Sequence, residues 1–213
     1  MLNALLLAAA ISQAGSGYNP TGPQIQFTMA SGKSFVITTD PKNSPKTVAH
    51  ILALVKKGFY DGQRVHRVEW WVTQWGAPES KTQPLDVMKD GKKIQNEKVG
   101  DGGSGKDIPA FEGAVNVDYV RGMVGIASTG LQVPGDSQIF ILKKDATRLY
   151  MSYAVLGKVT QGMDVVGRIQ RGDRIKKAQV MATESLVWKR RQGRFIVEGV
   201  PTPKPKGTKL KGN

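Results

Sequence analysis

Few side chains in this sequence are of the types that perform covalent or metal-centred chemistry. The 213 residues include two histidines, His50 and His66, and no cysteine. The lack of cysteine excludes disulfides, thiolate zinc sites and a cysteine nucleophile, and two histidines disfavour a histidine-rich metal site. A serine nucleophile activated by histidine would have to use one of these two residues. The composition therefore points away from covalent and metal chemistry.

Positive charge is abundant but concentrated at one end of the chain. Lys and Arg number 31 against 17 Asp and Glu, which gives a formal net charge of +14. Residues 189–213 hold eight basic residues and one acid, Glu198, and so supply +7 of this total. Such a run binds polyanions through sequence-blind electrostatics, but no basic motif of the RNA-reading kind accompanies it. We expect a solvated basic tail with weak polyanion or anionic-surface contact.

The two ends of the chain differ from its middle. Leu2 to Ile11 is an almost continuous apolar run, too short to span a bilayer but typical of a signal peptide cleaved after Ala14. An apolar segment packed on the domain is the alternative. We therefore expect export to the periplasm or extracellular space if residues 1–14 are a signal peptide, and a cytoplasmic protein otherwise. Residues 15–23 are expected to be a linker, and residues 201–213 a disordered basic tail rich in Pro, Lys and Gly.

The clearest helix signal follows residue 43. Ser44 is a candidate N-cap, Pro45 suits the first helical position, and apolar residues recur at i, i+3, i+4 and i+7. Gly58 supplies a stop. His50 lies off the apolar stripe of this helix and is expected to face solvent.

The remainder of residues 24–200 predicts a β-rich domain. Short segments of alternating polarity are separated by glycine-rich turns such as Asp90-Gly91, and a short helix is expected near Met163. The segments 178–187 and 194–197 predict a final hairpin. The expected architecture is mainly β: a closed eight-stranded antiparallel barrel capped by two α-helices.

Seven short motifs follow one another along residues 24–187. They are Asp40-Pro41 with Ser44-Pro45-Lys46-Thr47-Val48, Gly58-Phe59-Tyr60-Asp61-Gly62, His66-Arg67-Val68, Gly102-Gly103, Gly125-Ile126-Ala127, Ser137-Gln138-Ile139-Phe140-Ile141, and Leu156-Gly157-Lys158-Val159 with Gly162-Met163-Asp164-Val165-Val166. In this order and spacing they resemble the cyclophilins. The resemblance implies the cyclophilin-like barrel and a monomeric peptidyl-prolyl cis-trans isomerase without cofactor. It also implies a partner class, proline-containing segments of unfolded or flexible proteins.

The resemblance also assigns residues to a site. Arg67 matches the catalytic arginine of the family. The implied substrate-binding residues are Trp71, Gln74, Ile126, Ala127, Gln138, Phe140 and Tyr153. The link between Arg67 and Gln74 is one residue shorter than usual, so either Trp70 or Trp71 could line the proline pocket.

Several departures from the family pattern bear on substrate preference. Gln74-Trp75-Gly76-Ala77 replaces the usual Gln-Gly-Gly-Asp, and Leu149-Tyr150-Met151 replaces Leu-Asp-Gly. Arg148 falls where many members have an aromatic residue, and residues 79–99 resemble an insertion.

Isomerisation of an X–Pro bond breaks no covalent bond and needs no metal. Its barrier of about 18–20 kcal/mol comes from amide conjugation, and twisting the amide localises a lone pair on the prolyl nitrogen. A guanidinium near that nitrogen donates more strongly in the twisted state, which is the role expected of Arg67. Phe140 with Trp71 and Ile126 would form a dry floor for the proline ring. His66 should face away from Arg67 as a structural residue.

Two other functions compete with the isomerase. A catalytically weak barrel could bind proline peptides as a chaperone or scaffold, and the changed segment from Gln74 to Ala77 favours this alternative. The barrel could also be a carrier for a basic end that binds polyanions or the cell envelope. The intact set of Arg67, Gln74, Gln138 and Phe140 favours the isomerase.

Overall fold

The computed structural model of the chain describes residues 17–182, 187–191 and 194–198. The chain divides into two units after Met181. The expected signal peptide, residues 1–14, and the expected tail, residues 201–213, lie outside the described residues. Among the residues that are described, no helix is long and apolar enough to cross a membrane.

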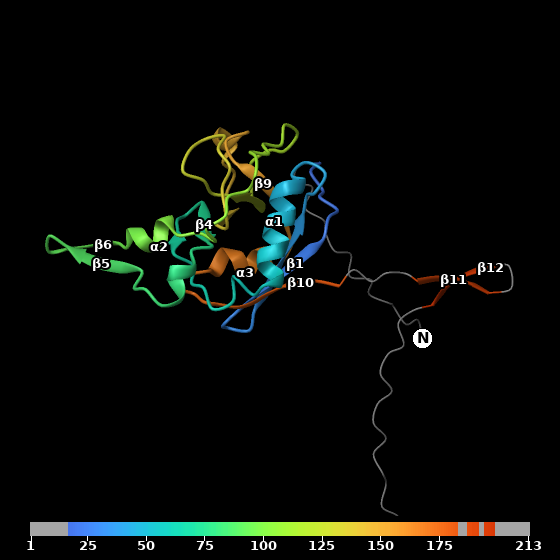
Figure 1. The fold of residues 1–213 in the computed structure, drawn as a ribbon, viewed down its shortest axis with the longest axis horizontal. Coiled ribbons are helices and arrows are strands. Elements are labelled where there is room, and N and C mark those ends of the chain that lie inside the picture. The colour runs from blue at the N-terminus through green and yellow to red at the C-terminus, as the bar shows by residue number, and fades with distance from the viewer. Residues whose placement is uncertain (1–16, 183–186, 192–193, 199–213) are drawn as a thin grey trace, which may run out of the picture. The chain divides into compact units, whose positions relative to one another are not determined.

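The first unit is built on a curled antiparallel sheet (Figure 1). Its eight strands follow the order β10-β1-β2-β9-β7-β8-β4-β3. The strands are β1 (Gln24–Met29), β2 (Ser34–Thr39), β3 (Arg67–Val68), β4 (Val72–Trp75), β7 (Met123–Ile126), β8 (Ile139–Leu142), β9 (Ala154–Gln161) and β10 (Ile175–Val180). The predicted mainly-β architecture with eight antiparallel strands is confirmed.

The two edges of this sheet approach each other through the residues that precede β3 and β10. Arg64 forms an isolated antiparallel bridge with Arg174. Backbone hydrogen bonds from Val65 N to Asp173 O (2.9 Å) and from Ile175 N to Gln63 O (2.8 Å) flank it. These bonds satisfy edge groups that would otherwise be unpaired, so the sheet curls into a barrel.

Both predicted helices are present, and the structure adds a third. Helix α1 (Pro45–Lys56) packs against β9 and β10, and α3 (Met163–Arg168) packs against β2. The additional helix is the five-residue α2 (Glu97–Asp101). Two short 3-10 helices, η1 (Pro78–Lys81) and η2 (Thr147–Leu149), complete the helical elements of the described residues.

The start of α1 is capped differently from the prediction. Ser44 precedes the helix, but its side chain makes no capping hydrogen bond. The carboxylate of Glu112 instead accepts hydrogen bonds from the backbone N–H groups of Lys46 (3.1 Å) and Thr47 (2.8 Å). A distant acid therefore satisfies the free amides and complements the positive end of the helix dipole. The expected stop is confirmed, because Gly58 adopts a positive φ of 69°.

Aromatic packing fills the interior of the barrel. Trp75, Phe27 and Phe35 are almost completely buried, and the ring centroid of Trp75 lies 5.2 Å from that of Phe27 and 5.9 Å from that of Phe35. A fully buried large apolar side chain contributes about 1.5–3 kcal/mol through removal of its surface from water. Trp75, one of the departures from the family pattern, thus serves the core.

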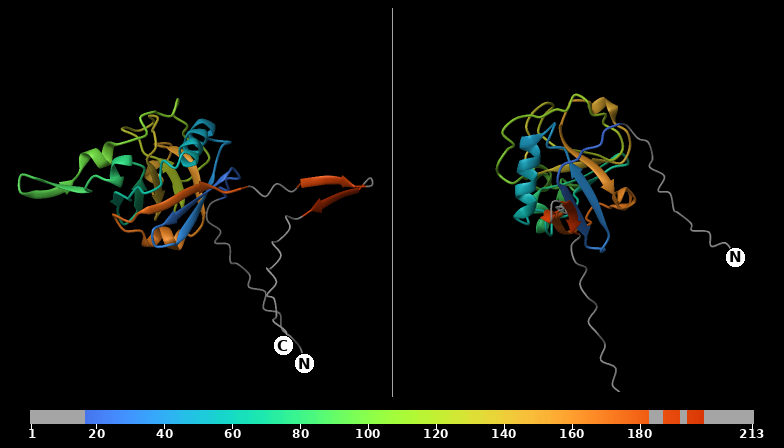
Figure 2. Two further views of the ribbon diagram at one scale, coloured as in Figure 1. Left: turned by 60° about the horizontal axis from the view of Figure 1, so that its bottom comes forward. Right: turned by 90° about the vertical axis from the view of Figure 1, so that its right-hand side faces the viewer.

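The segment of residues 78–101, called the insertion segment below, carries its own small sheet. Strands β5 (Asp86–Lys89) and β6 (Lys92–Gln95) pair as an antiparallel hairpin that extends away from the barrel (Figure 2). Its turn contains Asp90 and Gly91, both with positive φ, as the sequence predicts.

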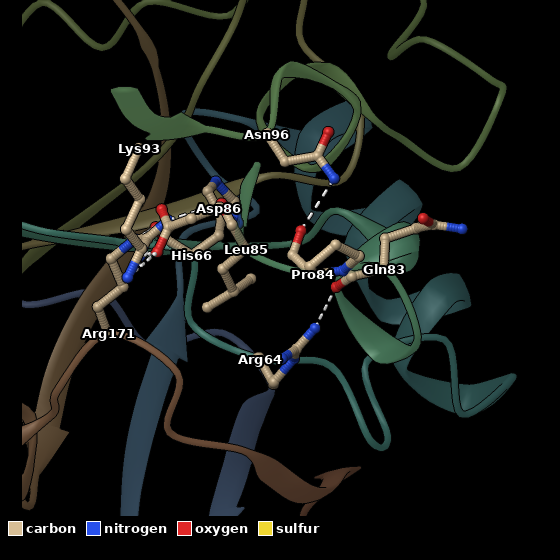
Figure 3. Close-up of polar contacts among 9 residues, drawn as sticks. All are labelled: Arg64, His66, Gln83, Pro84, Leu85, Asp86, Lys93, Asn96 and Arg171. Carbon is tan, nitrogen blue, oxygen red and sulfur yellow. Dashed lines mark hydrogen bonds and ion pairs between the residues drawn. The ribbon is translucent and has the colours of Figure 1, made fainter. Parts of the chain in front are cut away.

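Arginine side chains attach the insertion segment to the barrel (Figure 3). The guanidinium of Arg171 binds both carboxylate oxygens of Asp86 at 2.7 and 3.0 Å and donates to Leu85 O at 2.8 Å. Its Nε donates to His66 O on the barrel at 2.7 Å. Arg64 similarly donates to Gln83 O. The insertion segment is therefore attached where the sheet edges meet.

The last described residues form a separate hairpin of β11 (Val187–Arg191) and β12 (Arg194–Glu198). The predicted hairpin of segments 178–187 and 194–197 is wrong in its first strand. Strand β10 ends at Val180 and pairs with β1, because Ile175 and Ala178 are buried in the barrel core.

We expect Arg171→Ala to release the insertion segment without unfolding the barrel, because it removes the contacts to Asp86, Leu85 and His66 together. Amide hydrogen exchange in β5 and β6 should rise about tenfold, while exchange in β1 stays unchanged. Arg168→Ala is the matched control, since Arg168 pairs with Asp164 on α3 and both side chains are exposed. Unchanged exchange in β5 and β6 of Arg171→Ala would contradict this role.

Candidate active site on the outer face of the barrel

The strands β4, β7 and β8 present different side chains on their two faces. Ile139 and Ile141 of β8 lie in the interior core, whereas Phe140 between them belongs to a second cluster on the outer face. Cross-strand pairing places Gln74 of β4 and Gly125 of β7 opposite Phe140. Because side chains alternate along a strand, burial of the two isoleucines directs Phe140 outward.

Phe140 forms the floor of an apolar patch. The ring of Tyr153 meets it edge-on with centroids 5.5 Å apart, and Trp71, Ala127 and Leu149 pack against the same cluster. A Cβ atom at position 125 would lie 2.4 Å from the Phe140 ring, so only glycine lets the ring approach β7 this closely. The predicted residues Trp71, Ala127, Phe140 and Tyr153 are therefore brought together.

Arg67 lies at the edge of this patch, on β3 opposite Gln74. Its Nε and Nη2 both lie 2.6 Å from Glu69 Oε1, and its Nη1 donates to Gln74 Oε1 at 3.1 Å. The side chain is 40% exposed. A carboxylate and an amide thus orient the guanidinium while leaving part of it open to a ligand.

A chain of side-chain amides extends from Arg67 toward the insertion segment. Gln74 Nε2 donates to Gln138 Oε1 at 2.7 Å, and Gln138 Nε2 donates to the carbonyls of Gly100 (2.6 Å) and Gly102 (2.8 Å). The two carbonyls determine which way the Gln138 amide faces, and Gln138 in turn orients Gln74. The end of α2 therefore helps to orient the partner of Arg67.

Trp71, and not Trp70, borders the apolar patch. Trp70 is 74% exposed, whereas the indole N–H of Trp71 donates to Glu69 Oε2 at 2.8 Å. The guanidinium carbon of Arg148 lies 4.6 Å from the centre of the Trp71 ring, and that of Arg67 lies 5.7 Å from it. Two cations thus contact the electron-rich indole.

Ile126 does not join the other predicted site residues. It is 1% exposed and packs in the interior core, on the opposite face of the sheet from Phe140. Its neighbour Ala127 reaches the outer patch instead. The predicted floor of Phe140, Trp71 and Ile126 is therefore made in this structure by Phe140 and Trp71 with Tyr153 and Leu149.

A cavity of about 620 Å³ adjoins the amide pair. Gln74 and Gln138 form the wall nearest Arg67, and Ala127 links the cavity to the apolar patch. The remaining lining includes glycines of residues 100–105 and the acids Asp101, Asp107 and Asp136. The cavity and the apolar patch therefore meet at Ala127.

The two histidines have structural surroundings. The prediction that His50 faces solvent is wrong, because its Nε2 lies 3.0 Å from Asp136 Oδ1 and its side chain is only 11% exposed. The cause is the loop containing Asp136, which folds over α1. His66 is 1% exposed and has an Nδ1 without a partner among the described residues. Burial lowers the pKa of His66 from 6.5 to about 4, so the ring is neutral at pH 7.

Sequence reasoning missed the acid that orients Arg67. Burial opposes ionisation of Glu69, but hydrogen bonds from Arg67 and Trp71 outweigh it and hold the pKa of Glu69 below its ordinary value. Glu69 is thus charged near neutral pH. The spacing of Glu69 could have predicted this contact, since residues i and i+2 of an extended strand share a face. The sequence offers no such indication that the backbone carbonyls of Gly100 and Gly102 contact the site.

Comparisons with known proteins agree on one family. A family model described as "Cyclophilin type peptidyl-prolyl cis-trans isomerase/CLD" matches residues 24–187. A probable peptidyl-prolyl cis-trans isomerase of Brucella abortus is 34% identical over 150 residues, which cover 69% of this chain and 71% of that protein. Peptidyl-prolyl cis-trans isomerase B of Bacillus subtilis is 28% identical over 72% of this chain and 95% of that protein.

Solved structures show the same fold. A Cryptosporidium parvum cyclophilin type peptidyl-prolyl cis-trans isomerase aligns with a TM-score of 0.60 at 19% identity, covering 76% of this chain and 98% of that one. A second structure of that protein, determined in the presence of the dipeptide Ala-Pro, aligns with a TM-score of 0.59 at 18% identity and covers 75% and 99%.

We expect buried His66 to make the protein less stable in acid. The pKa of His66 is lower in the folded chain than in the unfolded chain, where it is about 6.5. Above this pH the ring is neutral in both states, and the contribution of His66 to the free energy of unfolding is complete. That contribution disappears as the pH falls toward about 4, a loss of about 3 kcal/mol from the free energy of unfolding. Urea unfolding of wild type and His66→Gln from pH 7 to pH 4 measures it. Parallel pH profiles for the two proteins would contradict the expectation.

Proposed function

Because the chain belongs to the cyclophilin-type peptidyl-prolyl cis-trans isomerase family, and is an enzyme of that class, we propose that Arg67 is its catalytic residue. The proposed reaction is isomerisation of X–Pro bonds in unfolded or flexible segments of proteins. The observation that carries the proposal is the guanidinium of Arg67, held by Glu69 and Gln74 at the edge of the patch built on Phe140.

The contacts of Arg67 leave donors for a substrate. A guanidinium has five N–H groups, and the contacts to Glu69 and Gln74 use one on each of the three nitrogens. One N–H on each of Nη1 and Nη2 is left for a ligand. As the amide twists, the prolyl nitrogen becomes a better acceptor, so a hydrogen bond from Arg67 stabilises the twisted state more than the planar one. Lowering a barrier of about 18–20 kcal/mol in this way accelerates rotation.

The apolar patch supplies the place for the proline ring. Phe140 would lie beneath the ring with Trp71 and Tyr153 at its sides, and the low local dielectric would strengthen the hydrogen bond from Arg67. Gln74 and Gln138 would exchange their mutual hydrogen bond for bonds to the peptide backbone. The C. parvum structure obtained in the presence of Ala-Pro supports a proline-containing ligand for this fold.

A proline-binding module without turnover is the competing function. The sequence feature that favoured it is the altered segment from Gln74 to Ala77. Trp75 and Ala77 of this segment are buried away from the outer patch, and Gln74 keeps its bonds to Arg67 and Gln138. This arrangement supports an isomerase over a binding module.

A second proposal concerns export. Its support is the apolar run of residues 2–11, which lies outside the described residues. Mature protein isolated from the native cell should begin near Gly15. Recovery of the chain starting at Met1 would overturn this proposal.

We expect Arg67→Ala to lower kcat/KM for a short X–Pro peptide by about 10²–10³, the loss typical of removing one preorganised donor. Arg67→Lys should restore only part of this loss, because an ammonium lacks the planar fork. A protease-coupled isomerisation assay measures both. Arg168→Ala, which removes an exposed arginine on α3, is the control and should behave like wild type.

Phe140→Ala should show a different pattern, losing peptide binding together with turnover. Arg67→Ala should bind peptide almost normally, because the planar amide nitrogen is a poor acceptor. Circular dichroism and thermal melting establish that each variant is folded. A folded Arg67→Ala protein with wild-type turnover would show that the assignment is wrong and favour the binding module.

A further inference from the structure

Two arginines lie at the wall of the apolar patch formed by Trp71. Arg148 belongs to the short helix η2, is exposed, and lies 4.6 Å above the Trp71 ring. The backbone N–H groups of Lys143 and Lys144 both donate to Trp71 O, so these two basic residues are bonded to the tryptophan through their main chains. The two cations that contact the indole ring itself are Arg148 and Arg67.

The acids near this wall are already engaged. Glu69 binds Arg67 and the Trp71 indole, and the carboxylate of Asp145 accepts a hydrogen bond from Arg121 N at 2.8 Å. Within the described part of the chain, Arg148 has no carboxylate at ion-pair distance. Its guanidinium lies over the indole on an exposed residue, and its positive charge contributes to the lowered pKa of Glu69.

The opposite end of the site has the other sign of charge. The cavity beyond Gln74 and Gln138 is lined by Asp101 and Asp107, and by Asp136, whose carboxylate is bonded to His50 and Ser104. A carboxylate on a bound peptide would be repelled from that cavity and attracted to the wall at Trp71. The charge distribution therefore discriminates between peptides by the residue that lies beside the proline on the Trp71 side.

We propose that Arg148 is a specificity-determining residue that selects proline peptides carrying an acidic side chain within two residues of the proline. This inference rests on the proposed function, because it places the proline ring on Phe140 beside Trp71. Consecutive Cα atoms are 3.8 Å apart, so a Glu or Asp one or two residues from the ring can reach the Arg148 guanidinium. The planar fork of arginine then pairs with the carboxylate by two parallel hydrogen bonds.

The experiment compares short peptides that differ only in one residue near the proline. Four series place Glu, Gln or Lys at one of the two positions before or the two positions after the proline. Both kcat/KM and peptide affinity are measured for each peptide. In at least one series, kcat/KM and affinity of the wild type should be about two- to fivefold higher for the Glu peptide than for the Gln peptide, and lower for the Lys peptide. This is the size of effect that an exposed ion pair produces. The preference should fade in 1 M salt, where the Debye length is about 3 Å.

Variants assign the preference to Arg148. Arg148→Gln should abolish the preference for Glu over Gln peptides in kcat/KM and affinity. Arg148→Lys should retain part of this preference, and Arg148→Glu should reverse it in favour of Lys peptides. Arg168→Gln removes the same charge from α3 and should leave the ratio as in wild type. The ratio between peptides is insensitive to a uniform loss of activity, so partial misfolding would not imitate the result.

The outcomes separate this inference from the proposed function. Turnover of every peptide without a charge preference would overturn the role of Arg148 and leave the isomerase intact. A preference that survives Arg148→Gln would also overturn it and assign the selection to other cations. If turnover is absent, the affinities still decide whether Arg148 selects acidic peptides.

Discussion

Side-chain packing inside the barrel is the constraint on which the site depends. Ile139 and Ile141 are buried with the aromatic core, and a strand that buries alternate residues must turn the intervening ones to its other face. Phe140 is therefore forced outward, and the pairing of β8 with β4 and β7 brings Gln74 and Gly125 alongside it. The outer patch exists because the inner core determines the register of these strands.

A continuous series of polar contacts connects the insertion segment to the proposed catalytic arginine. Arg171 attaches the hairpin to the barrel, α2 follows that hairpin, and the carbonyls of Gly100 and Gly102 orient Gln138. Gln138 binds Gln74, which accepts from Arg67. Each amide has one orientation that satisfies both neighbours, so a segment that differs from the family pattern contributes to the orientation of the site.

The departures from the cyclophilin pattern fall into two physical classes. Trp75 is absorbed by the interior, where it packs edge-on against Phe27 and Phe35 and has no access to the outer patch. Arg148 lies at the outer patch, where it places a charge on Trp71. Beside it, the carboxylate of Glu69 orients Arg67 and Trp71 together. The first departure affects the packing of the core, and the second affects the site.

Local signals determined much of this protein from sequence alone: the turn at Asp90-Gly91, Pro45 and Gly58 at the ends of α1, and ordered motifs that identify the family. What only the tertiary structure decided involves contacts between distant segments, such as the Glu112 cap of α1 and the pair of His50 with Asp136. The position of Ile126 belongs to the same class. Ile126 and Ala127 are both apolar, so their sequence does not say which one faces the core. That choice follows from the curled sheet, whose interior accepts the larger side chain and leaves the smaller one to the site.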